Sequence, residues 1–174
     1  MIIQILDHIT EEIKQIRIDV FMKEQGFEDE FDEIDETAKF VLLSIDGKAA
    51  GTCRYFPSDV AGDAHIGRMA VRKLYRGQHL GTKIMMAAEN AIRRDGFKTC
   101  SLSAQVQAQP FYESLGYVVE GDTYLDEGCP HILMRKELQG NLCVEGLFYK
   151  IIDNFIYFSW VVNVGIMTCM RNYY

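Results

Sequence analysis

Two blocks of the sequence hold residues whose types and spacing suit a phosphorylated ligand and acid–base chemistry beside it. The first block, RGQHLG, begins at Arg76 and directly precedes a segment of helical period. Backbone N–H groups in the first turn of a helix lack intrahelical partners, and the helix dipole adds partial positive charge there. The turn from Arg76 to Thr82 is therefore predicted to hold a pyrophosphate. The second block, FYESLGY, holds Tyr112, a phenol that can donate a proton.

Together the two blocks resemble the acyl-coenzyme A site of the GNAT superfamily of N-acetyltransferases. The pyrophosphate loop of that superfamily has Gln or Arg, two residues, Gly, one residue, and Gly or Ala. Arg76 and Gly81 match the first and last positions, whereas His79 stands where the superfamily has glycine. Glycine there lets a phosphate approach the backbone and adopts left-handed geometry at least cost. The resemblance implies a retained loop with altered contacts at His79.

The second block matches the superfamily pattern F-Y-x-x-x-G-F/Y at Phe111, Tyr112, Gly116 and Tyr117. The resemblance implies that one strand splays from its parallel neighbour and that the acyl-pantetheine arm enters the gap between them. The cofactor-binding residues that it implies are Met69, Ala70, Val71, Arg76, Gly77, Gln78, His79, Leu80, Gly81, Thr82, Gln105, Ala108, Phe111 and Tyr112. Of these, Met69 and Val71 are implied to bond the pantetheine amides through their backbone groups.

A third match, VFMKEQ, ends in the pair Glu24-Gln25 and resembles a bacterial subgroup that carries VF-x-x-EQ near its first helix. The likeness covers about Met1 to Leu138. It implies a GNAT acyltransferase domain over residues 1–138, followed by an apolar extension, residues 139–174, whose role is open. The implied activity is transfer of an acetyl group from acetyl-CoA to a primary amine of a small molecule, by direct attack in a ternary complex. A non-catalytic acyl-CoA binding or sensing module is the alternative, because His79 alters the loop.

The implied reaction needs few groups from the protein. An alkylamine has a pKa near 10.4 and must lose a proton before it attacks the thioester. His131, in the strand PHILM, is one candidate base, because some small-molecule members carry a histidine there; Glu24 is the other. The backbone N–H of Met69 is a candidate donor to the tetrahedral oxyanion. Tyr112 is the candidate that protonates the leaving thiolate.

Local patterns predict the elements that position these residues. Apolar runs predict strands at residues 2–6, 39–45, 48–56, 65–71, 99–104, 117–120 and 131–138, and helical spacing predicts helices at residues 10–23, 82–95 and 108–115. The pair Asp46-Gly47 predicts a tight hairpin. The fold class expected is α/β: a mixed, mostly antiparallel central sheet with a V-shaped splay between two parallel strands, flanked by helices.

Charge and composition limit the function further. The chain of 174 residues carries a formal charge of −7, which argues against nucleic acid as a partner. Residues 66–98 hold eight Lys or Arg against two acids, whereas residues 24–36 hold eight acids and no base. A basic patch for the cofactor could thus face an acidic rim for a cationic amine, unless the acidic run is a solvated loop. Arg17, Arg54 and Arg68 could grip a substrate carboxylate, although surface ion pairs are more common for such residues.

The remaining features concern location and the C-terminal tail. Five scattered cysteines without a CxxC pair indicate reduced thiols in a cytoplasmic protein, no metal is expected, and the N-terminus lacks a signal peptide pattern. Residues 154–170 are uncharged but interrupted by polar side chains, and they are short for a membrane span. We expect this segment to pack on the domain or on a second copy in a homodimer; a membrane anchor is the less favoured alternative.

Overall fold

The computed structural model describes residues 1–28, 30–126, 128–138, 151–152 and 155–156. By its internal contacts the chain divides into two units, Met1–Leu138 and Gln139–Tyr174. The first unit holds every element that the sequence analysis connects with the candidate site.

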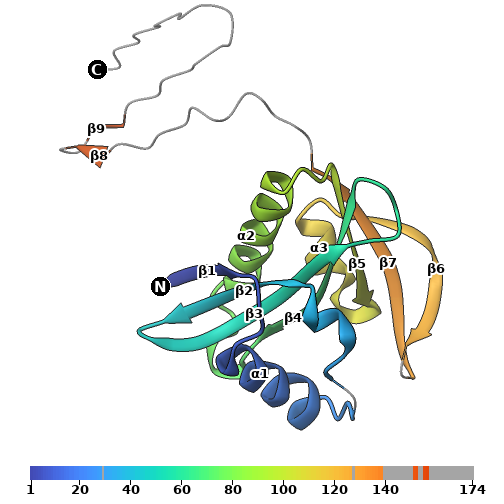
Figure 1. The fold of residues 1–174 in the computed structure, drawn as a ribbon, viewed down its shortest axis with the longest axis horizontal. Helices are drawn as coiled ribbons and strands as arrows, with labels where there is room; N and C mark the ends of the chain where they lie inside the picture. The colour runs from blue at the N-terminus through green and yellow to red at the C-terminus, as the bar shows by residue number, and fades with distance from the viewer. Residues whose placement is uncertain (29, 127, 139–150, 153–154, 157–174) are drawn as a thin grey trace, which may run out of the picture. The chain divides into compact units, whose positions relative to one another are not determined.

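A mixed sheet of seven strands forms the centre of the first unit (Figure 1). The strands are β1 (Ile2–Leu6), β2 (Lys39–Ile45), β3 (Lys48–Pro57), β4 (Asp63–Val71), β5 (Thr99–Gln105), β6 (Val118–Asp126) and β7 (Cys129–Glu137). Their order is β1-β2-β3-β4-β5-β7-β6, and only the pair β4 and β5 is parallel. The mixed, mostly antiparallel α/β arrangement expected from the sequence is confirmed.

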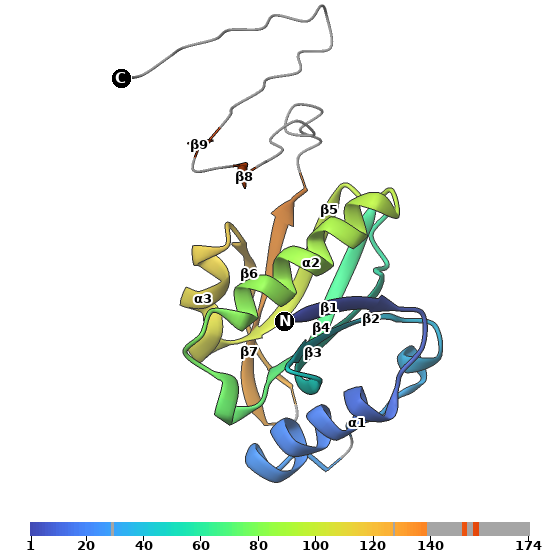
Figure 2. The same cartoon turned by 90° about the vertical axis from the view of Figure 1, so that its left-hand side faces the viewer.

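Helices cover both faces of this sheet. Helix α1 (Glu11–Arg17) lies on one face, and α2 (Leu80–Arg94) and α3 (Gln109–Ser114) lie on the other (Figure 2). Side chains of a strand point alternately to its two faces. On β2, Val41 and Leu43 accordingly enter the core under α2, while Phe40 and Leu42 enter the core under α1. Both faces of the sheet are therefore buried.

Four short helices complete the connections. They are η1 (Ile18–Glu24), a π-helix, and the 3₁₀ turns η2 (Glu33–Glu36), η3 (Lys73–Tyr75) and η4 (Val106–Ala108). The sequence predicts one helix over residues 10–23. Thr10 does cap α1, accepting a hydrogen bond from the N–H of Ile13 at 3.5 Å, but the helix changes to π geometry from Ile18.

The two parallel strands separate along their length. Their pairing runs from Asp63 with Thr99 to Ile66 with Leu102, and beyond that point β4 continues to Val71 without a partner on this side. On its other side, β4 has a bulge at which Arg68 and Met69 together face one residue of β3. Arg68 takes the left-handed conformation there, with φ of 52°. This is the splay that the sequence analysis expects.

Helix α2 approaches the sheet closely at Gly51 of β3. A Cβ atom at this position would lie 2.7 Å from Cδ1 of Ile84 and 2.9 Å from the carbonyl oxygen of Ala70. Real carbon contacts are never this short in a packed interior. Glycine at position 51 therefore sets how deeply α2 sits on the sheet.

In the second unit, strands β8 (Ile151–Ile152) and β9 (Phe155–Ile156) form an antiparallel pair. The predictions for residues 139–174 fall mostly outside the described residues. Within the described part of the chain, no helix combines the length and the apolar character that a membrane crossing requires.

Candidate active site

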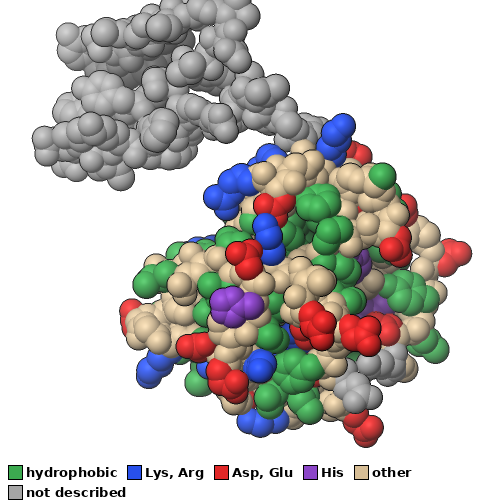
Figure 3. All heavy atoms as spheres, viewed as in Figure 1, with side chains coloured by type: hydrophobic (Ala, Val, Ile, Leu, Met, Phe, Trp, Pro, Cys, Tyr) green, Lys and Arg blue, Asp and Glu red, His purple; other side chains and the backbone are tan. Residues whose placement is uncertain are grey.

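A cavity of about 680 Å³ opens where β4 and β5 separate. Met69, Ala70 and Val71 of β4 line it, as do Gln105 at the end of β5 and Tyr112 of α3. In the space-filling view of Figure 3, histidine side chains are visible in a recess of the surface, with acidic side chains near its rim. The volume falls in the range of small-molecule sites. The splay thus gives the sheet an internal binding space.

The start of α2 offers unpaired backbone donors. No side chain caps this helix, and its first backbone hydrogen bond runs from Lys83 to His79. The N–H groups of Leu80, Gly81 and Thr82 consequently have no helical acceptor. His79 takes the left-handed conformation, with φ of 56°, at the position where the sequence resemblance expects glycine. The loop therefore keeps the left-handed backbone conformation that favours glycine, although the residue is histidine.

Gly81 also meets a spatial demand. A Cβ atom there would lie 3.1 Å from Cε of Met69 and 3.2 Å from Cζ of Phe111. These two side chains line the cavity. The absence of a side chain at Gly81 lets the helix start lie directly against the cavity wall.

The unpaired edge of β4 faces the gap. The N–H of Arg72 donates to the carbonyl of Ala50 on β3 at 2.9 Å. Backbone groups of successive residues point to opposite neighbouring strands. The N–H of Val71 therefore points toward the β5 side, where no described strand pairs with it. Met69 lies in the bulge, where this alternation is interrupted.

Arg76 is held by Glu24. Its guanidinium forms two hydrogen bonds to the Glu24 carboxylate, at 2.5 and 2.9 Å, and its Nε donates to the carbonyl of Val71 at 2.8 Å. The hydrogen bond from Arg76 lowers the pKa of Glu24. Arg76 lines the cavity and Glu24 does not. This geometry gives Glu24 the role of holding Arg76 and makes it a weak base.

Tyr112 lies at the bottom of the cavity with 9% of its surface exposed. Its ring packs edge-on against Phe111 and Tyr117. Its hydroxyl makes no hydrogen bond to any residue in the described part of the chain. Burial raises the pKa of Tyr112 above its ordinary value. The phenol is therefore a protonated donor throughout the physiological pH range.

His131 of β7 presents one ring nitrogen to the cavity. Its Nδ1 lies 2.9 Å from the carbonyl oxygen of Cys129, which can only accept, so Nδ1 carries the proton. The ring stacks on Tyr124 with centroids 6.3 Å apart. In the neutral ring, Nε2 then has a free lone pair, the form that a general base requires.

A second imidazole in the same cavity, His65 of β4, is a residue that sequence reasoning missed. Its Nδ1 lies 3.1 Å from Oγ of Ser101, and Ser101 donates to the Asp63 carboxylate at 2.7 Å. The serine therefore accepts from the Nδ1–H of His65, leaving Nε2 unprotonated. Burial lowers the pKa of His65. Only strand alternation could have signalled it, because Asp63 and His65 lie on the same face of β4.

Three acids of the run 24–36, Glu30, Asp32 and Asp35, are bound by arginines and do not form a free negative rim. Glu30 accepts from Nε of buried Arg17 at 2.7 Å, and Asp35 accepts from Nη1 of the same arginine at 2.6 Å. Asp32 makes two hydrogen bonds to Arg54, at 2.5 and 2.7 Å. This part of the run is therefore neither a solvated loop nor an open acidic rim, the two alternatives of the sequence analysis. We call Arg17, Arg54, Arg68, Glu30, Asp32 and Asp35 the arginine network.

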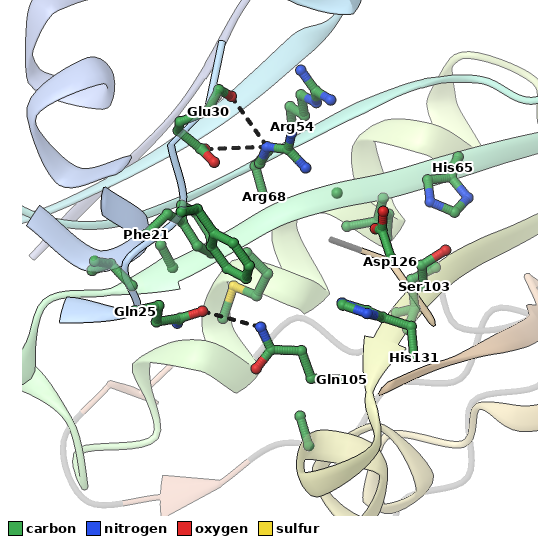
Figure 4. Close-up of a pocket in the computed structure, with 18 of the residues that line it drawn as sticks. Phe21, Gln25, Glu30, Arg54, His65, Arg68, Ser103, Gln105, Asp126 and His131 are labelled. Atoms are coloured by element: carbon green, nitrogen blue, oxygen red, sulfur yellow. Dashed lines mark hydrogen bonds and ion pairs between the residues drawn. The ribbon is translucent and has the colours of Figure 1, made fainter. Parts of the chain in front are cut away.

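One hydrogen bond crosses the cavity. Nε2 of Gln105, on β5, donates to Oε1 of Gln25, directly after η1, at 3.0 Å (Figure 4). Both residues line the cavity. The pair Glu24-Gln25 thus binds two side chains of the cavity lining, Arg76 and Gln105.

The structure brings most of the predicted site residues together. The cavity lining includes Met69, Ala70, Val71, Arg76, Gln105, Ala108, Phe111, Tyr112 and His131. Gly77, Gln78, His79, Leu80, Gly81 and Thr82 form the turn and the first turn of α2 beside it, and the side chain of Leu80 is buried in the core. Glu24 reaches the site only through Arg76. Within the described residues, no cluster of side chains suited to a metal ion is found.

Comparison with known proteins gives consistent matches over the first unit. A family model described as acetyltransferase (GNAT) domain matches residues 5–138. The N-acetyltransferase YjcF of Bacillus subtilis is 35% identical over 125 residues, which cover 70% of this chain and 88% of YjcF. Two crystal structures superpose closely. An acyl-CoA N-acyltransferase from Pseudomonas aeruginosa is 28% identical with a TM-score of 0.70, covering 78% of this chain and 99% of its own. Escherichia coli ElaA is 27% identical with a TM-score of 0.71, covering 78% and 99%.

Proposed function

This chain belongs to the GNAT acetyltransferase family, and from this premise we propose that it transfers an acetyl group from acetyl-CoA to the primary amine of a small molecule. The amine attacks the thioester directly while both substrates are bound. The family supports a transferase that uses an acyl-CoA. The acetyl group, the amine acceptor and the direct attack are our proposal.

One observation carries this proposal: the cavity at the opening between β4 and β5 lies beside the first turn of α2, where Gly81 faces the cavity-lining side chains of Met69 and Phe111. The N–H groups of Leu80, Gly81 and Thr82 suit a pyrophosphate, because they are unpaired and lie at the positive end of the helix dipole. The N–H of Val71 suits an amide carbonyl of the pantetheine arm, and the N–H of Met69 remains for the oxyanion. A ligand that joins a diphosphate to an extended, amide-containing arm would meet the donors of the α2 start and of β4 together.

The residues of the cavity supply the remaining steps. The ammonium of the acceptor gives a proton to an imidazole, and its nitrogen then bonds to the thioester carbon. The N–H of Met69 donates to the oxyanion that forms, and such donors are worth about 3 to 4 kcal/mol each. The carbon–sulfur bond then breaks, and the hydroxyl of Tyr112 donates to the leaving thiolate. The amide nitrogen loses its second proton to solvent through the imidazole.

We assign the base to an imidazole rather than to Glu24. His131 and His65 both expose an unprotonated Nε2 to the cavity, whereas the Glu24 carboxylate is occupied by Arg76. Replacement of His131 by Gln should remove the acidic limb from the pH profile of kcat/KM, and His65→Gln tests the second ring. Glu24→Gln should keep that limb and raise KM for acetyl-CoA. Loss of the limb in Glu24→Gln alone would reverse the assignment.

Release of coenzyme A thiol in the presence of acetyl-CoA and a panel of amines tests the proposal as a whole. We expect release that depends on both substrates and an N-acetylated product by mass spectrometry. Tight binding of acetyl-CoA with no release on any amine would instead favour the non-catalytic module, for which the histidine in the pyrophosphate loop is the supporting feature.

A further inference from the structure

The charges that line the cavity discriminate between acceptors with and without a carboxylate. The positively charged arginines of the lining are Arg54, Arg68 and Arg76. A substrate carboxylate would need at least one of them to be available. Whether one is available can be decided from their partners.

Each of the three arginines is already bound by carboxylates of the described residues, although Nε of Arg54 is buried without a hydrogen-bond partner among them. Arg54 is bound by Asp32 and Asp35, and Arg76 is bound by Glu24. Arg68, the most accessible arginine of the network, lies 3.1 Å from the Glu30 carboxylate and 3.4 Å from that of Asp32 (Figure 4). With Arg17, the network holds three guanidinium groups and three carboxylates.

A carboxylate brought to this wall would meet the negative groups as closely as the positive ones. Like charges held a few ångströms apart repel strongly where water is partly excluded. Such a juxtaposition is a common way to reject an unwanted ligand. The balanced network therefore disfavours acceptors that carry a carboxylate beside the amine.

A single carboxylate of the lining remains without an ion pair to the described residues. Asp126 lies at the end of β6, two residues beyond Tyr124, which pairs with His131 in the sheet. Residues two apart on a strand share a face, so Asp126 is a diagonal neighbour of His131 at roughly 7 to 8 Å. An ammonium group placed between them would face the carboxylate and the free Nε2 together. Figure 4 shows Asp126 beside His131 and Ser103.

Apolar side chains form part of the cavity wall beside the arginine network. The rings of Phe21, Phe27 and Phe56 line it together with Ile34 and Val20. Phe21 and Phe27 lie with ring centroids 6.5 Å apart. Such a wall gains stability by burying a hydrocarbon or an aromatic ring, not a polar chain.

We propose that the acceptor is a primary amine with an aromatic or branched apolar body and no carboxylate, and that Asp126 attracts its ammonium group. This inference rests on the proposed acetyl transfer and names the substrate class of the same site. It assigns recognition to the apolar wall, rejection of amino acids to the arginine network, and orientation of the amine to Asp126.

Matched pairs of acceptors that differ only in the carboxylate test this inference. The pairs are phenethylamine with phenylalanine, tyramine with tyrosine, and isoamylamine with leucine. We expect kcat/KM from coenzyme A release to be at least about tenfold higher for the amine of each pair. Equal values, or a preference for the amino acids, would overturn the inference.

Two variants of the same strand assign the role of Asp126. Asp126→Asn should lower kcat/KM for phenethylamine by about two- to fivefold, the range for an exposed ion pair. The control is Asp122→Asn, which removes an exposed carboxylate of β6 outside the cavity lining and should leave kcat/KM unchanged. An equal effect of the two variants would remove Asp126 from the proposal.

Binding measurements keep the inference separate from the proposed activity. Calorimetric titration of the full chain, saturated with coenzyme A, compares phenethylamine with phenylalanine without any reaction. Tighter binding of phenethylamine supports the inference even if no acetyl transfer is detected. Tighter binding of phenylalanine contradicts it, whatever the activity.

Discussion

At the scale of single residues, the site is defined by which proton each group keeps. His65 and His131 each hold a proton on Nδ1 through a neighbouring acceptor, so that both rings offer Nε2 to the cavity. Tyr112 keeps its phenolic proton because burial raises its pKa. The sequence makes Tyr112 the candidate that protonates the leaving thiolate, but the raised pKa makes complete transfer of its proton less favourable. A hydrogen bond from its intact O–H to the thiolate fits this environment better than complete proton transfer.

Replacement of Tyr112 by Phe tests this role. The ring packing remains while the donor is lost, so we expect kcat to fall by about 10²- to 10⁴-fold, the usual range for a lost acid catalyst. KM for acetyl-CoA should change little. Steady-state kinetics of both proteins, with circular dichroism to verify folding, measures this. An unchanged kcat would show that the tyrosine only fills space.

Replacement of His79 by Gly tests the strained turn before α2. A left-handed conformation costs a residue with a side chain about 1 to 2 kcal/mol, and glycine nothing. Part of this gain is offset, because glycine loses more entropy on folding. We therefore expect His79→Gly to leave the free energy of unfolding unchanged or to raise it by up to about 1 kcal/mol, and to tighten binding of coenzyme A.

The neighbouring variant Gln78→Gly is the matched control for this test. Gln78 is not among the residues with positive φ, so glycine there adds only flexibility and should lower stability by about 0.5 to 1 kcal/mol. Urea unfolding measures both variants, and calorimetry measures coenzyme A binding. A loss in His79→Gly as large as in Gln78→Gly would contradict the strain argument.

At the scale of elements, the arginine network joins α1 to β3 and β4 through the segment that contains η2. Arg17 comes from the end of α1, Arg54 from β3 and Arg68 from the bulge of β4. Their carboxylate partners belong to residues 30–35. The segment is therefore held by ion pairs to three separate elements.

Replacement of Arg17 by Met should expose this dependence. Arg17 is fully buried, and its loss leaves Glu30 with Arg68 alone and Asp35 with Arg54 alone. Breaking a buried pair in this way costs about 3 to 5 kcal/mol. The control, Lys23→Ala, removes an exposed pair with Asp19 and should change stability by less than about 0.5 kcal/mol. Urea unfolding of both variants measures the difference; similar small losses would contradict a structural role for the network.

The sequence predicted elements well where the signal is local. The Asp46-Gly47 hairpin, the Thr10 cap and the strands of the core follow from neighbouring residues, and the structure confirms them. Strand β6 was predicted only over residues 117–120 but extends to Asp126, because VVEGDTYLD lacks an apolar alternation and obtains its hydrogen bonds from β7.

Features that join distant residues could not be predicted. The partners of the acidic run are arginines that lie up to 52 residues away in sequence, and nothing near residues 24–36 indicates them. The same holds for His65, whose serine partner lies 36 residues away. For the site, the blocks RGQHLG and FYESLGY were informative because one helix and one strand separate them, the spacing expected from the resemblance. The base and the acceptor wall depend on which side chains the sheet brings together.

At the scale of the whole molecule, carboxylates held by arginines and hydroxyl groups make folding sensitive to acid. The hydrogen bond from Arg54 lowers the pKa of Asp32. Burial opposes ionisation of Asp63, but three hydroxyl groups and Arg135 outweigh it and lower the pKa. A carboxyl group whose pKa is lowered in the folded protein stabilises the fold at pH values above its pKa in the unfolded chain, about 3.9. This contribution is lost as the pH falls through the lower pKa of the folded protein.

We therefore expect the free energy of unfolding to decrease steeply as the pH is lowered below about 4. Asp63→Asn should be less stable at neutral pH and should show a shallower decrease over this range, since one titrating group is gone. Asp122→Asn, at an exposed position, serves as the control. Urea unfolding between pH 7 and the acid range measures the slopes. An unchanged slope in Asp63→Asn would exclude Asp63 as a source of the acid sensitivity.

The contact between α2 and β3 also belongs to the whole molecule. At Gly51, a methyl group would press against Ile84 and the Ala70 carbonyl, so that the helix would have to retreat from the sheet. Its first turn, which carries the N–H groups at Leu80, Gly81 and Thr82, would retreat with it. We expect a side chain at position 51 to weaken the binding of an anionic ligand at the start of α2 through this displacement. Any redesign of the cofactor preference would have to preserve the glycine at position 51 or compensate for its loss.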